Sequence, residues 1–365
     1  MIRVLYVHGG TLLYGGTEAY MMNFYRHFDR CQVQVDFVVH GDARGVYDEE
    51  IERLGGRVFH VPVKSRDYRG NSRALRSIMQ RGQYAAVHAH TDANNAHVLR
   101  IARQCGVPLR ISHSHNTRTQ SDSRLRRLYN AMEKQRIPGV ATHLFACSEP
   151  AGKWLYGSHP FQIVPNAIEI DRFAFDPRRR EEMRRQMGLE NRLVLGHVGR
   201  FSFQKNHPFL LEIFAVVAEK RPEAVLLLIG DGEERERIER LALLRGLRER
   251  VRIVPPTPLI ADYMQAMDVF LLPSHFEGLG IVLVEAQAAG LPCFASRGAV
   301  PTEADLTGLL TYLPLEEPPA VWAEQVMTVR PDSREGRWRP IAEAGYDITE
   351  AAARLQQFYL TGEYI

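Results

Sequence analysis

The hydrophobic pattern alternates along the chain between short apolar runs and longer stretches whose apolar positions recur every three or four residues. The short runs are rich in β-branched and aromatic residues, as in buried strands, and the longer stretches are typical of amphipathic helices. In the first half, strands are predicted over residues 2–8, 33–40, 57–63, 85–90, 109–116 and 142–148, and helices over residues 17–28, 45–56 and 71–82. Strands that alternate with helices indicate βαβ units and parallel sheets.

The pattern breaks near residue 165 and then starts again. Residues 163–173, IVPNAIEIDRF, are predicted to be an irregular extended piece. The second cycle has predicted strands over residues 192–200, 224–232, 251–256, 268–274 and 291–296, and predicted helices over residues 207–222, 233–247, 259–267 and 280–290. The sequence therefore predicts an α/β protein with two doubly wound domains, residues 1–165 and 166–348, and a final amphipathic helix over about residues 349–365 that completes the first domain.

Composition is that of an ordinary globular protein, with 365 residues, 45% hydrophobic and 24% charged. No apolar run reaches the roughly 18 residues that a membrane span needs. The four cysteines, Cys31, Cys105, Cys147 and Cys293, lie far apart without paired spacing, which favours free thiols in a reducing compartment. We therefore expect a cytoplasmic protein.

Charge is distributed unevenly along the chain. Residues 1–160 contain 22 Lys and Arg against 13 Asp and Glu, a net +9, and the remainder contains 24 against 30, a net −6. A helix predicted over residues 123–136 concentrates part of the positive charge in Arg124, Arg126, Arg127, Lys134 and Arg136. Such a helix suits peripheral contact with the anionic inner face of the cytoplasmic membrane. The alternative is a solvated basic face, and no nucleic-acid partner is expected.

Two glutamates surround a Gly-Leu-Gly in SHFEGLGIVLVEAQAAG, residues 274–290. The loop leaves the carboxyl end of a predicted strand, where open α/β sheets bind ligands, and a helix is predicted to begin near Gly280. A helix N-terminus attracts an anion, and Gly278 and Gly280 would let a phosphate approach the backbone. Glu285 suits the two hydroxyls of a ribose and Glu277 a sugar hydroxyl. The pattern indicates a nucleotide-sugar site, and the alternative is that both glutamates are surface charges of the helix.

Two cations are predicted at the same edge of the sheet. Arg200 and Lys205 follow the predicted strand 192–200 in HVGRFSFQKNHPF. Two cations there would neutralise a pyrophosphate and stabilise its charge as it leaves. The alternative is a pair of surface cations.

Three segments of the second half occur in a characteristic order: G-R…Q-K-N, then IGDGEE, then MQAMDVFLLPSHFEGLGIVLVEAQAAGLP. With these segments, the second half resembles the nucleotide-binding half of glycosyltransferase family 4, also called group 1. The resemblance implies a retaining enzyme of the GT-B fold, with two Rossmann-like domains facing across a cleft. It matches the family's E-x7-E motif with Glu277, by the donor sugar, and Glu285, on the donor ribose. The resemblance also implies that the diphosphate is bound by Arg200, Lys205 and the segment Gly278, Leu279, Gly280. The donor would be a nucleotide-diphosphate sugar, most simply a UDP-sugar, and no cofactor or metal is implied.

The first half extends the resemblance, which covers nearly the whole chain. GGTEAYMMNFYRHF resembles the family's opening loop, so Gly15 and Gly16 would lie against the diphosphate. RISHSHNT resembles the strand end that carries the family's active-site histidine, a role that falls on His113. The tail resembles exopolysaccharide and capsule glycosyltransferases, which implies a saccharide or lipid-linked saccharide acceptor held by the first domain.

Four histidines, His88, His90, His113 and His115, gather on two predicted strand ends. A metal site would need a defined further ligand and a carboxylate, and the sequence offers neither, so we expect no metal. The alternative to a functional role for each histidine is a core or loop histidine with satisfied hydrogen bonds.

Other functions fit the sequence less well. HGGTLLYGG is not the dinucleotide fingerprint G-x-G-x-x-G, which argues against a dehydrogenase. A sugar-nucleotide epimerase of the same fold and a non-catalytic sugar-nucleotide-binding scaffold stay open as alternatives. The sequence departs from the family pattern at two places. Ala167 stands where the family usually has glycine, so a positive φ is not expected there. The VPPTPLIAD loop is stiffened by prolines, so the identity of the nucleotide base of the donor stays open.

Overall fold

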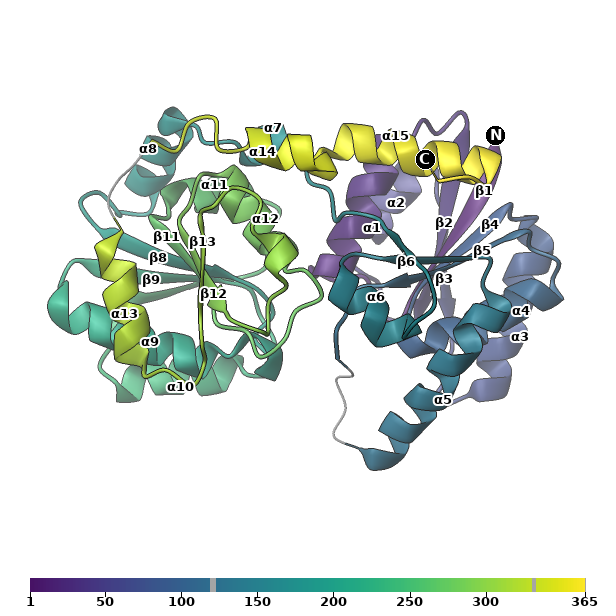
Figure 1. Cartoon of the computed structure of the whole chain (residues 1–365), viewed down its shortest axis with the longest axis horizontal. Helices are drawn as coiled ribbons and strands as arrows, with labels where there is room; N and C mark the ends of the chain where they lie inside the picture. Colours follow the sequence, from purple (N-terminus) through teal and green to yellow (C-terminus); the bar gives the residue numbers. More distant parts are fainter. Residues whose placement is uncertain (119–122, 330–332, 365) are drawn as a thin grey trace. The chain divides into compact units, whose positions relative to one another are not determined.

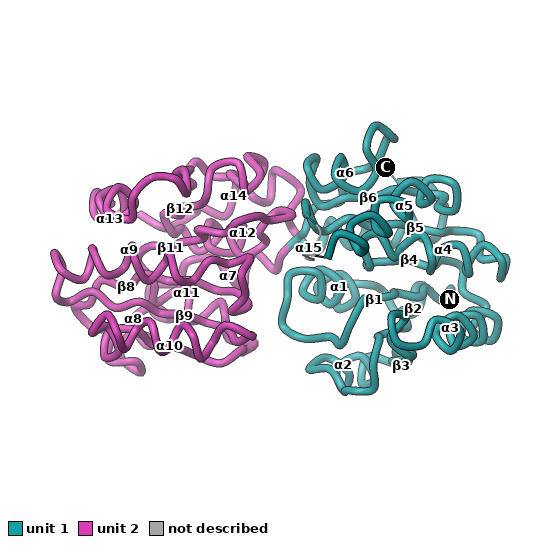
Figure 2. The backbone as a smooth tube through the Cα atoms, turned by 90° about the horizontal axis from the view of Figure 1, so that it is seen from below, with its two compact units in different colours: residues 1–167, 348–365 teal, residues 168–347 magenta. Residues whose placement is uncertain are grey.

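The computed structural model describes residues 1–118, 123–329 and 333–364, and the chain divides into two compact units (Figure 1, Figure 2). Unit 1 comprises residues 1–167 and 348–365, and unit 2 comprises residues 168–347. The sequence placed these boundaries at residues 165 and 348, and residue 365 of the expected final helix lies outside the described residues.

Unit 1 is built on a parallel sheet whose described residues form seven strands in the order β3-β2-β1-β4-β5-β6-β7. The strands are β1 (Ile2–His8), β2 (Val33–His40), β3 (Val58–Val61), β4 (Ala86–His90), β5 (Leu109–Ser114), β6 (His143–Ala146) and β7 (Gln162–Ile163). The helices are α1 (Gly16–His27), α2 (Asp48–Arg53), α3 (Tyr68–Gly82), α4 (Asn95–Gln104), α5 (Arg124–Val140), α6 (Glu149–Tyr156) and α15 (Ile348–Thr361), with the short η1 (Asp92–Asn94) after β4.

Alternation along β1 builds two separate cores in unit 1. Val4 and Tyr6 belong to the core that α1 and α15 cover, whereas Leu5 and Val7 belong to the core that α3 and α4 cover. All four side chains are fully buried, because a central parallel strand with helices on both faces has no solvent-facing side. The final helix α15 packs its apolar stripe, which includes Tyr359, into the same core as α1 and so belongs to unit 1.

Unit 2 repeats the architecture with a parallel sheet of six strands in the described residues, ordered β10-β9-β8-β11-β12-β13. The strands are β8 (Leu193–Val198), β9 (Ala224–Ile229), β10 (Val251–Val254), β11 (Val269–Leu272), β12 (Cys293–Ser296) and β13 (Leu310–Leu313). The helices are α7 (Ile170–Phe173), α8 (Pro177–Gln186), α9 (His207–Lys220), α10 (Arg235–Leu244), α11 (Ile260–Ala266), α12 (Ile281–Ala288), α13 (Pro319–Thr328) and α14 (Arg339–Ile341), with short η2 (Phe203–Lys205), η3 (Arg248–Arg250), η4 (Thr302–Ala304) and η5 (Ala342–Tyr346).

The doubly wound α/β class predicted from the sequence is confirmed, and several elements differ in detail, since α4, α6, β13 and α13 were not predicted. The stretch 163–173 is not extended throughout, because it ends in the short helix α7. Helix α8 was not predicted from the sequence, because it has no apolar stripe and no buried residue. Guanidinium groups hold it in place instead, since Arg180 and Arg184 both pair with Asp268.

Among the described residues, every helix is too short or too polar to span a lipid bilayer.

Candidate functional site

Glu277 is a buried carboxylate in the loop that leaves β11. It accepts hydrogen bonds at 2.7 Å from Lys205 Nζ and at 2.6 Å from Ser274 Oγ. The Nε2 of Gln204 donates to its other oxygen at 3.3 Å, and Glu277 is only 4% exposed. A first-turn surface charge would be solvated, so the structure excludes that alternative for Glu277.

Glu285 lies in the second turn of α12 and is 7% exposed. Among the described residues, no hydrogen-bond donor is recorded for its carboxylate. Burial raises the pKa of this carboxyl group to about 8, against the opposing effect of the Arg172 guanidinium. A buried carboxyl group with unused acceptor capacity is costly for folding, and such groups cluster at ligand sites.

The Gly-Leu-Gly segment connects these two glutamates at the start of α12. Gly280 is the N-cap of the helix at φ +81°, a left-handed conformation that favours glycine. A Cβ on Gly280 would come within 3.3 Å of a Leu272 methyl group, and Leu279 is buried at 2% exposure. Because Gly280 has no side chain, none of its atoms covers the first amide groups of α12.

Arg200 and Lys205 lie in the loop after β8, which pairs with β11 in the sheet. The side chain of Lys205 is 14% exposed and faces Glu277. The Arg200 side chain is 66% exposed, and its Nε donates to Glu233 Oε2 at 3.1 Å. Both cations thus follow the carboxyl end of β8, but Lys205 neutralises a buried carboxylate, whereas the ion-pair partner of Arg200 is the exposed Glu233.

Gly15 and Gly16 begin helix α1 of unit 1, with Gly15 as the N-cap in extended backbone. The Glu18 side chain folds back over this end of the helix. It lies so close that a Cβ added to Gly15 would be 2.5 Å from Glu18 Oε2. Glu18 Oε1 also lies 3.7 Å from His8 Nε2. A carboxylate of the protein itself therefore occupies the electropositive helix end in this structure.

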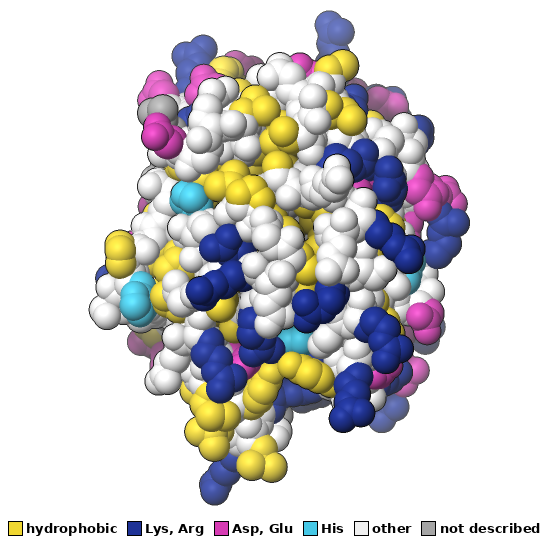
Figure 3. All heavy atoms as spheres, turned by 90° about the vertical axis from the view of Figure 1, so that its right-hand side faces the viewer, with side chains coloured by type: hydrophobic (Ala, Val, Ile, Leu, Met, Phe, Trp, Pro, Cys, Tyr) yellow, Lys and Arg dark blue, Asp and Glu magenta, His cyan; other side chains and the backbone are white. Residues whose placement is uncertain are grey.

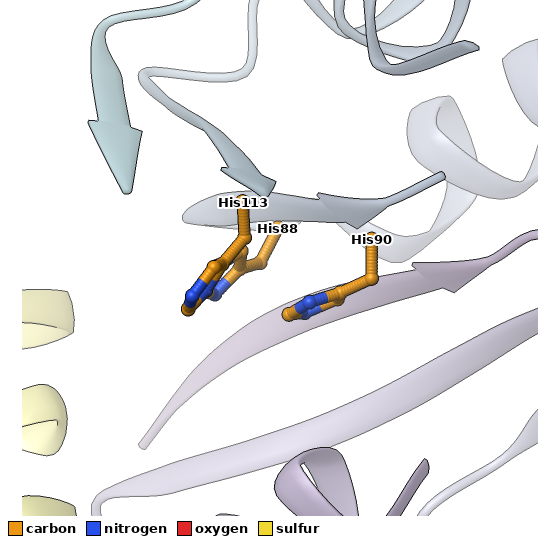
Figure 4. Close-up of side chains that lie close together, drawn as sticks. All are labelled: His88, His90 and His113. Atoms are coloured by element: carbon orange, nitrogen blue, oxygen red, sulfur yellow. The ribbon is translucent and has the colours of Figure 1, made fainter. Parts of the chain in front are cut away.

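Histidines 88, 90, 113 and 115 form a two-by-two arrangement of rings, here called the histidine grid. Figure 4 shows His88, His90 and His113 projecting from β4 and β5 to the same side of the sheet. Rings stack along each strand, with centroids 4.2 Å apart for His88–His90 and for His113–His115. Across the strands, His88 Nε2 lies 3.1 Å from His113 Nδ1, and His90 Nδ1 lies 2.8 Å from His115 Nε2.

Burial lowers the pKa of all four imidazoles, to about 3 for His115, so the grid is uncharged at neutral pH. One ligand atom from each of His88, His90 and His113 lies within 4.8 Å of the others, close enough to surround an ion. However, both ring nitrogens of His88 already have hydrogen-bond partners. His88 would therefore have to give up one of these hydrogen bonds to bind an ion through a ring nitrogen.

Some buried polar atoms of the grid have no partner among the described residues. They are His90 Nε2, His113 Nε2 and His115 Nδ1, together with the hydroxyl of Tyr20, whose ring packs against three of these imidazoles. Buried polar atoms are usually hydrogen-bonded, so each of these atoms lacks the partner that such an atom normally has.

Sequence reasoning missed several polar residues around these sites. Asp92 follows β4 at φ +52°, and its carboxylate accepts from Asn116 Nδ2 at 2.8 Å. Burial raises the pKa of Asp92 to about 6. A left-handed aspartate at a strand end is a feature of functional sites, but only its position after a predicted strand signalled it in the sequence. Ser274, three residues before Glu277, gave a similar weak signal.

The predicted residues fall into two sets, one in each unit, and the printed contacts join Lys205 to Glu277. Unit 2 contains the glutamates, the cations and the Gly-Leu-Gly segment, all at the ends of β8 and β11: Arg200, Lys205, Glu277, Gly278, Leu279, Gly280 and Glu285. Unit 1 contains Gly15, Gly16 and His113.

Comparisons with known proteins identify relatives over the whole chain. A family model described as "Glycosyl transferases group 1" matches residues 179–305, and one described as "Glycosyl transferase 4-like domain" matches residues 15–167. The chain is 37% identical to "Putative glycosyltransferase EpsF" of Bacillus subtilis, over 98% of this chain and 96% of the relative. It is 27% identical to "UDP-Gal:alpha-D-GlcNAc-diphosphoundecaprenol alpha-1,3-galactosyltransferase" of Escherichia coli, over 61% of this chain and 60% of that one.

Among solved structures, the fold is similar to that of Anabaena Alr3699/HepE in complex with UDP-glucose. The TM-score is 0.80 at 20% sequence identity, with 100% of both chains covered. The crystal structure of WaaG, a glycosyltransferase involved in lipopolysaccharide biosynthesis, gives a TM-score of 0.70 at 20% identity, covering 98% of this chain and 95% of that chain.

Proposed function

The chain belongs to the group 1 glycosyltransferases and has the GT-B fold, and from this premise we propose that it is a retaining hexosyltransferase. It transfers a hexose from a UDP-sugar to a hydroxyl of a glycan or lipid-linked saccharide in bacterial surface-polysaccharide synthesis. Support for the donor comes from the HepE structure, which binds UDP-glucose, and from the Escherichia coli relative, whose name specifies UDP-Gal. The same name specifies a diphosphoundecaprenol-linked acceptor, which supports a lipid-linked saccharide here.

The observation that carries the proposal is the pair of buried glutamates that follow β11, Glu277 in the loop and Glu285 in helix α12. Glu285 has unused acceptor capacity, which suits the two hydroxyls of a ribose. Glu277, held by Lys205 and Ser274, would accept from a hydroxyl of the donor sugar. The first amides of α12, together with Arg200 and Lys205 from the segment after β8, would hold the diphosphate.

The proposed reaction uses these charges to stabilise a leaving group. The bond between the anomeric carbon and the diphosphate oxygen breaks through an oxocarbenium-like state, and the acceptor hydroxyl attacks from the same face. Arg200, Lys205 and the α12 amides would stabilise the departing nucleoside diphosphate. A phosphate oxygen of that group takes the acceptor proton, so no side-chain base is needed.

His113 would hydrogen-bond the reacting sugar in this mechanism, and unit 1 would hold the acceptor. The Nε2 atom of His113 is buried and has no hydrogen-bond partner among the described residues, so a hydrogen bond to a ligand would supply one. We propose metal-independent transfer, because two cations and a helix end supply the positive charge that a metal would otherwise bring. Activity that persists after exhaustive chelation would support this, and activity that returns only with a divalent ion would contradict it.

We also propose peripheral contact with an anionic membrane through α5. Lys134 and Arg136 are engaged elsewhere, because Lys134 donates to Trp154 O at 3.0 Å and Arg136 pairs with Glu133. The N-terminal part of the helix instead combines exposed cations with exposed apolar side chains at helical spacing: Arg124, Leu125 (81% exposed), Arg126, Arg127, Leu128 (60%) and Met132 (45%). In Figure 3, apolar side chains gather at the lower end of unit 1, where α5 lies in Figure 1.

Vesicle sedimentation tests this contact. Binding to anionic vesicles should fall with Leu125→Ser and Leu128→Ser together, and with rising salt. The matched control is Leu243→Ser with Leu244→Ser on α10, which removes leucines of similar exposure (54% and 75%) from unit 2. Equal binding by all three proteins, or no binding at all, would rule out the contact.

The donor site is tested by thermal-shift measurements with UDP, GDP, ADP and their common sugars, on wild type and Glu285→Ala in parallel. A stabilisation specific to uridine nucleotides and lost in Glu285→Ala is expected. No stabilisation at concentrations well above millimolar would contradict the proposal and favour a scaffold. Conversion of a UDP-sugar into its epimer without added acceptor would favour the epimerase alternative.

A further inference from the structure

Two half-buried cations of unit 1, Lys64 and Arg100, are called the cation pair below. Lys64 follows the carboxyl end of β3, and Arg100 lies in the second turn of α4, the helix that follows β4. In Figure 3, Lys and Arg side chains are spread over the side of unit 1 that lies at the right of Figure 1, where α3 and α4 are labelled. Open α/β sheets bind ligands beyond the carboxyl ends of their strands, so the surroundings of Lys64 are a place to look for a ligand site.

Neutral groups hold Lys64 in place. Its Nζ donates at 2.8 Å to Asn94 Oδ1 and at 2.8 Å to the Tyr129 hydroxyl, and it lies 5.1 Å from the centre of the Tyr129 ring. An ammonium group has three N–H donors, which is one more than these two hydrogen bonds use. Among the described residues, no carboxylate forms a recorded ion pair with Lys64.

Arg100 also has neutral partners. Its Nη2 donates to the Tyr68 hydroxyl at 3.1 Å and lies 3.2 Å from His97 Nδ1. His97 Nε2 lies 3.1 Å from Asn71 Oδ1, an oxygen that can only accept, so Nε2 carries the ring proton and Nδ1 accepts from Arg100. Burial, with the charges of Lys64 and Arg100, lowers the pKa of His97 to about 3, so the imidazole stays neutral. No ion pair of Arg100 is recorded within the described part of the chain.

The charges around the cation pair do not balance. Burial lowers the pKa of Lys64, the charge of Glu133 opposes this effect, and the charge of Arg100 adds to it. Glu133 already forms an ion pair with Arg136 at 2.6 Å, and Asp67 caps the N-terminus of α3. The two cations therefore repel each other without a carboxylate of their own. Like charges held close together destabilise the folded state, and a bound anion would remove this cost.

The donors around the cation pair suit a phosphate group. A phosphate monoester carries a charge of about −1.5 to −2 at pH 7 and three acceptor oxygens, and it pairs well with arginine and lysine. The hydroxyls of Tyr68 and Tyr129 contact the same two cations and would donate to further phosphate oxygens. A neutral sugar would leave both charges uncompensated.

We propose that Lys64 and Arg100 bind a phosphate group, and that this phosphate belongs to the acceptor. The phosphate site rests on the contacts above. Its assignment to the acceptor rests on the proposed function, in which unit 1 holds the acceptor and residues of unit 2 hold the donor diphosphate. The acceptor is then a saccharide linked to a lipid through a phosphate or diphosphate, and not a neutral glycan.

Calorimetric titration of the full chain with inorganic pyrophosphate, at constant ionic strength, tests the site. The Kd in Lys64→Met and in Arg100→Met should be about tenfold or more above that of wild type, the effect of losing one charged hydrogen bond. The control is Arg76→Met on α3, which removes an exposed arginine that donates to a neutral partner, Gln104 Oε1, at 2.7 Å. Absence of binding to wild type, unchanged Kd values in both variants, or an equal loss in the control would overturn the site.

Pyrophosphate is also expected to bind to the proposed donor residues of unit 2, so the titration is repeated with saturating UDP. Binding that persists with UDP and weakens in Lys64→Met would support a phosphate site apart from the donor site. Binding that UDP abolishes would overturn it. Absence of binding by any uridine nucleotide would contradict the proposed function alone, because the comparison of wild type with Lys64→Met in pyrophosphate does not depend on UDP.

Farnesyl diphosphate distinguishes a lipid-linked phosphate from a free one. It carries a diphosphate on a short isoprenoid chain, and it should displace pyrophosphate from wild type and bind at least about tenfold more weakly to Lys64→Met. Exclusion of farnesyl diphosphate from a site that still binds pyrophosphate would show that the site takes a free phosphate, and would overturn its assignment to a lipid-linked acceptor.

Discussion

Lys205 Nζ donates a hydrogen bond to Oε1 of Glu277 at 2.7 Å, and this ion pair is nearly excluded from solvent. A donor diphosphate at the start of α12 would compete for the same ammonium group. Lys205 is therefore both a structural counter-ion and the candidate ligand of the leaving group, and these two roles can be separated by mutation.

Removing either member of the Lys205–Glu277 pair should destabilise the protein by about 3 kcal/mol, because it leaves the other charge buried without a counter-ion. The double variant Lys205→Met with Glu277→Gln should recover about 2 kcal/mol of the summed loss. Denaturant unfolding of wild type, both single variants and the double variant measures this coupling. Strictly additive losses would mean that the two side chains do not interact in solution.

Stability should depend on pH through Glu285. Burial raises its pKa in the folded protein from 4.5 to about 8, so between these values the folded state binds more protons than the unfolded state. This contribution to stability is therefore fully present below about pH 4.5 and is lost as pH rises towards about 8. Glu285→Gln should raise the melting temperature more at pH 8 than at pH 5. An equal change at both pH values would contradict the raised pKa.

Arg200→Ala should weaken donor binding without affecting stability. The side chain is largely exposed and has one surface partner, so the free energy of unfolding should change by less than about 0.5 kcal/mol. The Kd for a UDP-sugar should rise about tenfold, the effect of losing one charged hydrogen bond. Calorimetry with Arg237→Ala as control, a similarly exposed arginine paired with Glu234, separates this from a general charge effect. Equal affinities in the two variants would exclude Arg200 from the donor site.

Two tyrosines in one core should respond oppositely to loss of their hydroxyls. Tyr20 and Tyr359 are both buried, but the Tyr20 hydroxyl has no partner among the described residues whereas that of Tyr359 has two. Tyr20→Phe should leave the free energy of unfolding unchanged or raise it by about 1 kcal/mol, and Tyr359→Phe should lower it by about 1–3 kcal/mol. A loss in Tyr20→Phe would reveal an ordered water or other partner at that hydroxyl.

Several parts of this structure could be predicted from sequence because they depend on local patterns. The apolar run 2–8 is β1, the run 268–274 contains β11, and the glycine before Ile281 is the N-cap of α12. Helix α8 could not be predicted in this way, because its binding to the rest of unit 2 depends on arginines that reach Asp268, more than 80 residues away.

The sequence by itself determined the alternation of strands and helices, the restart after residue 165, and the order of Arg200, Lys205, Glu277 and Glu285 along the chain. These are properties of short segments, since side-chain period and glycine conformation act over a few residues.

Only the tertiary structure decided what those residues contact. It paired Lys205 with Glu277 across 72 residues and buried Glu285 where no described residue donates a hydrogen bond to its carboxylate. It also placed Tyr359 of the last helix against His88, 271 residues away. Burial and hydrogen-bond partners depend on which strands become neighbours in the sheet, and that is a property of the whole folded unit.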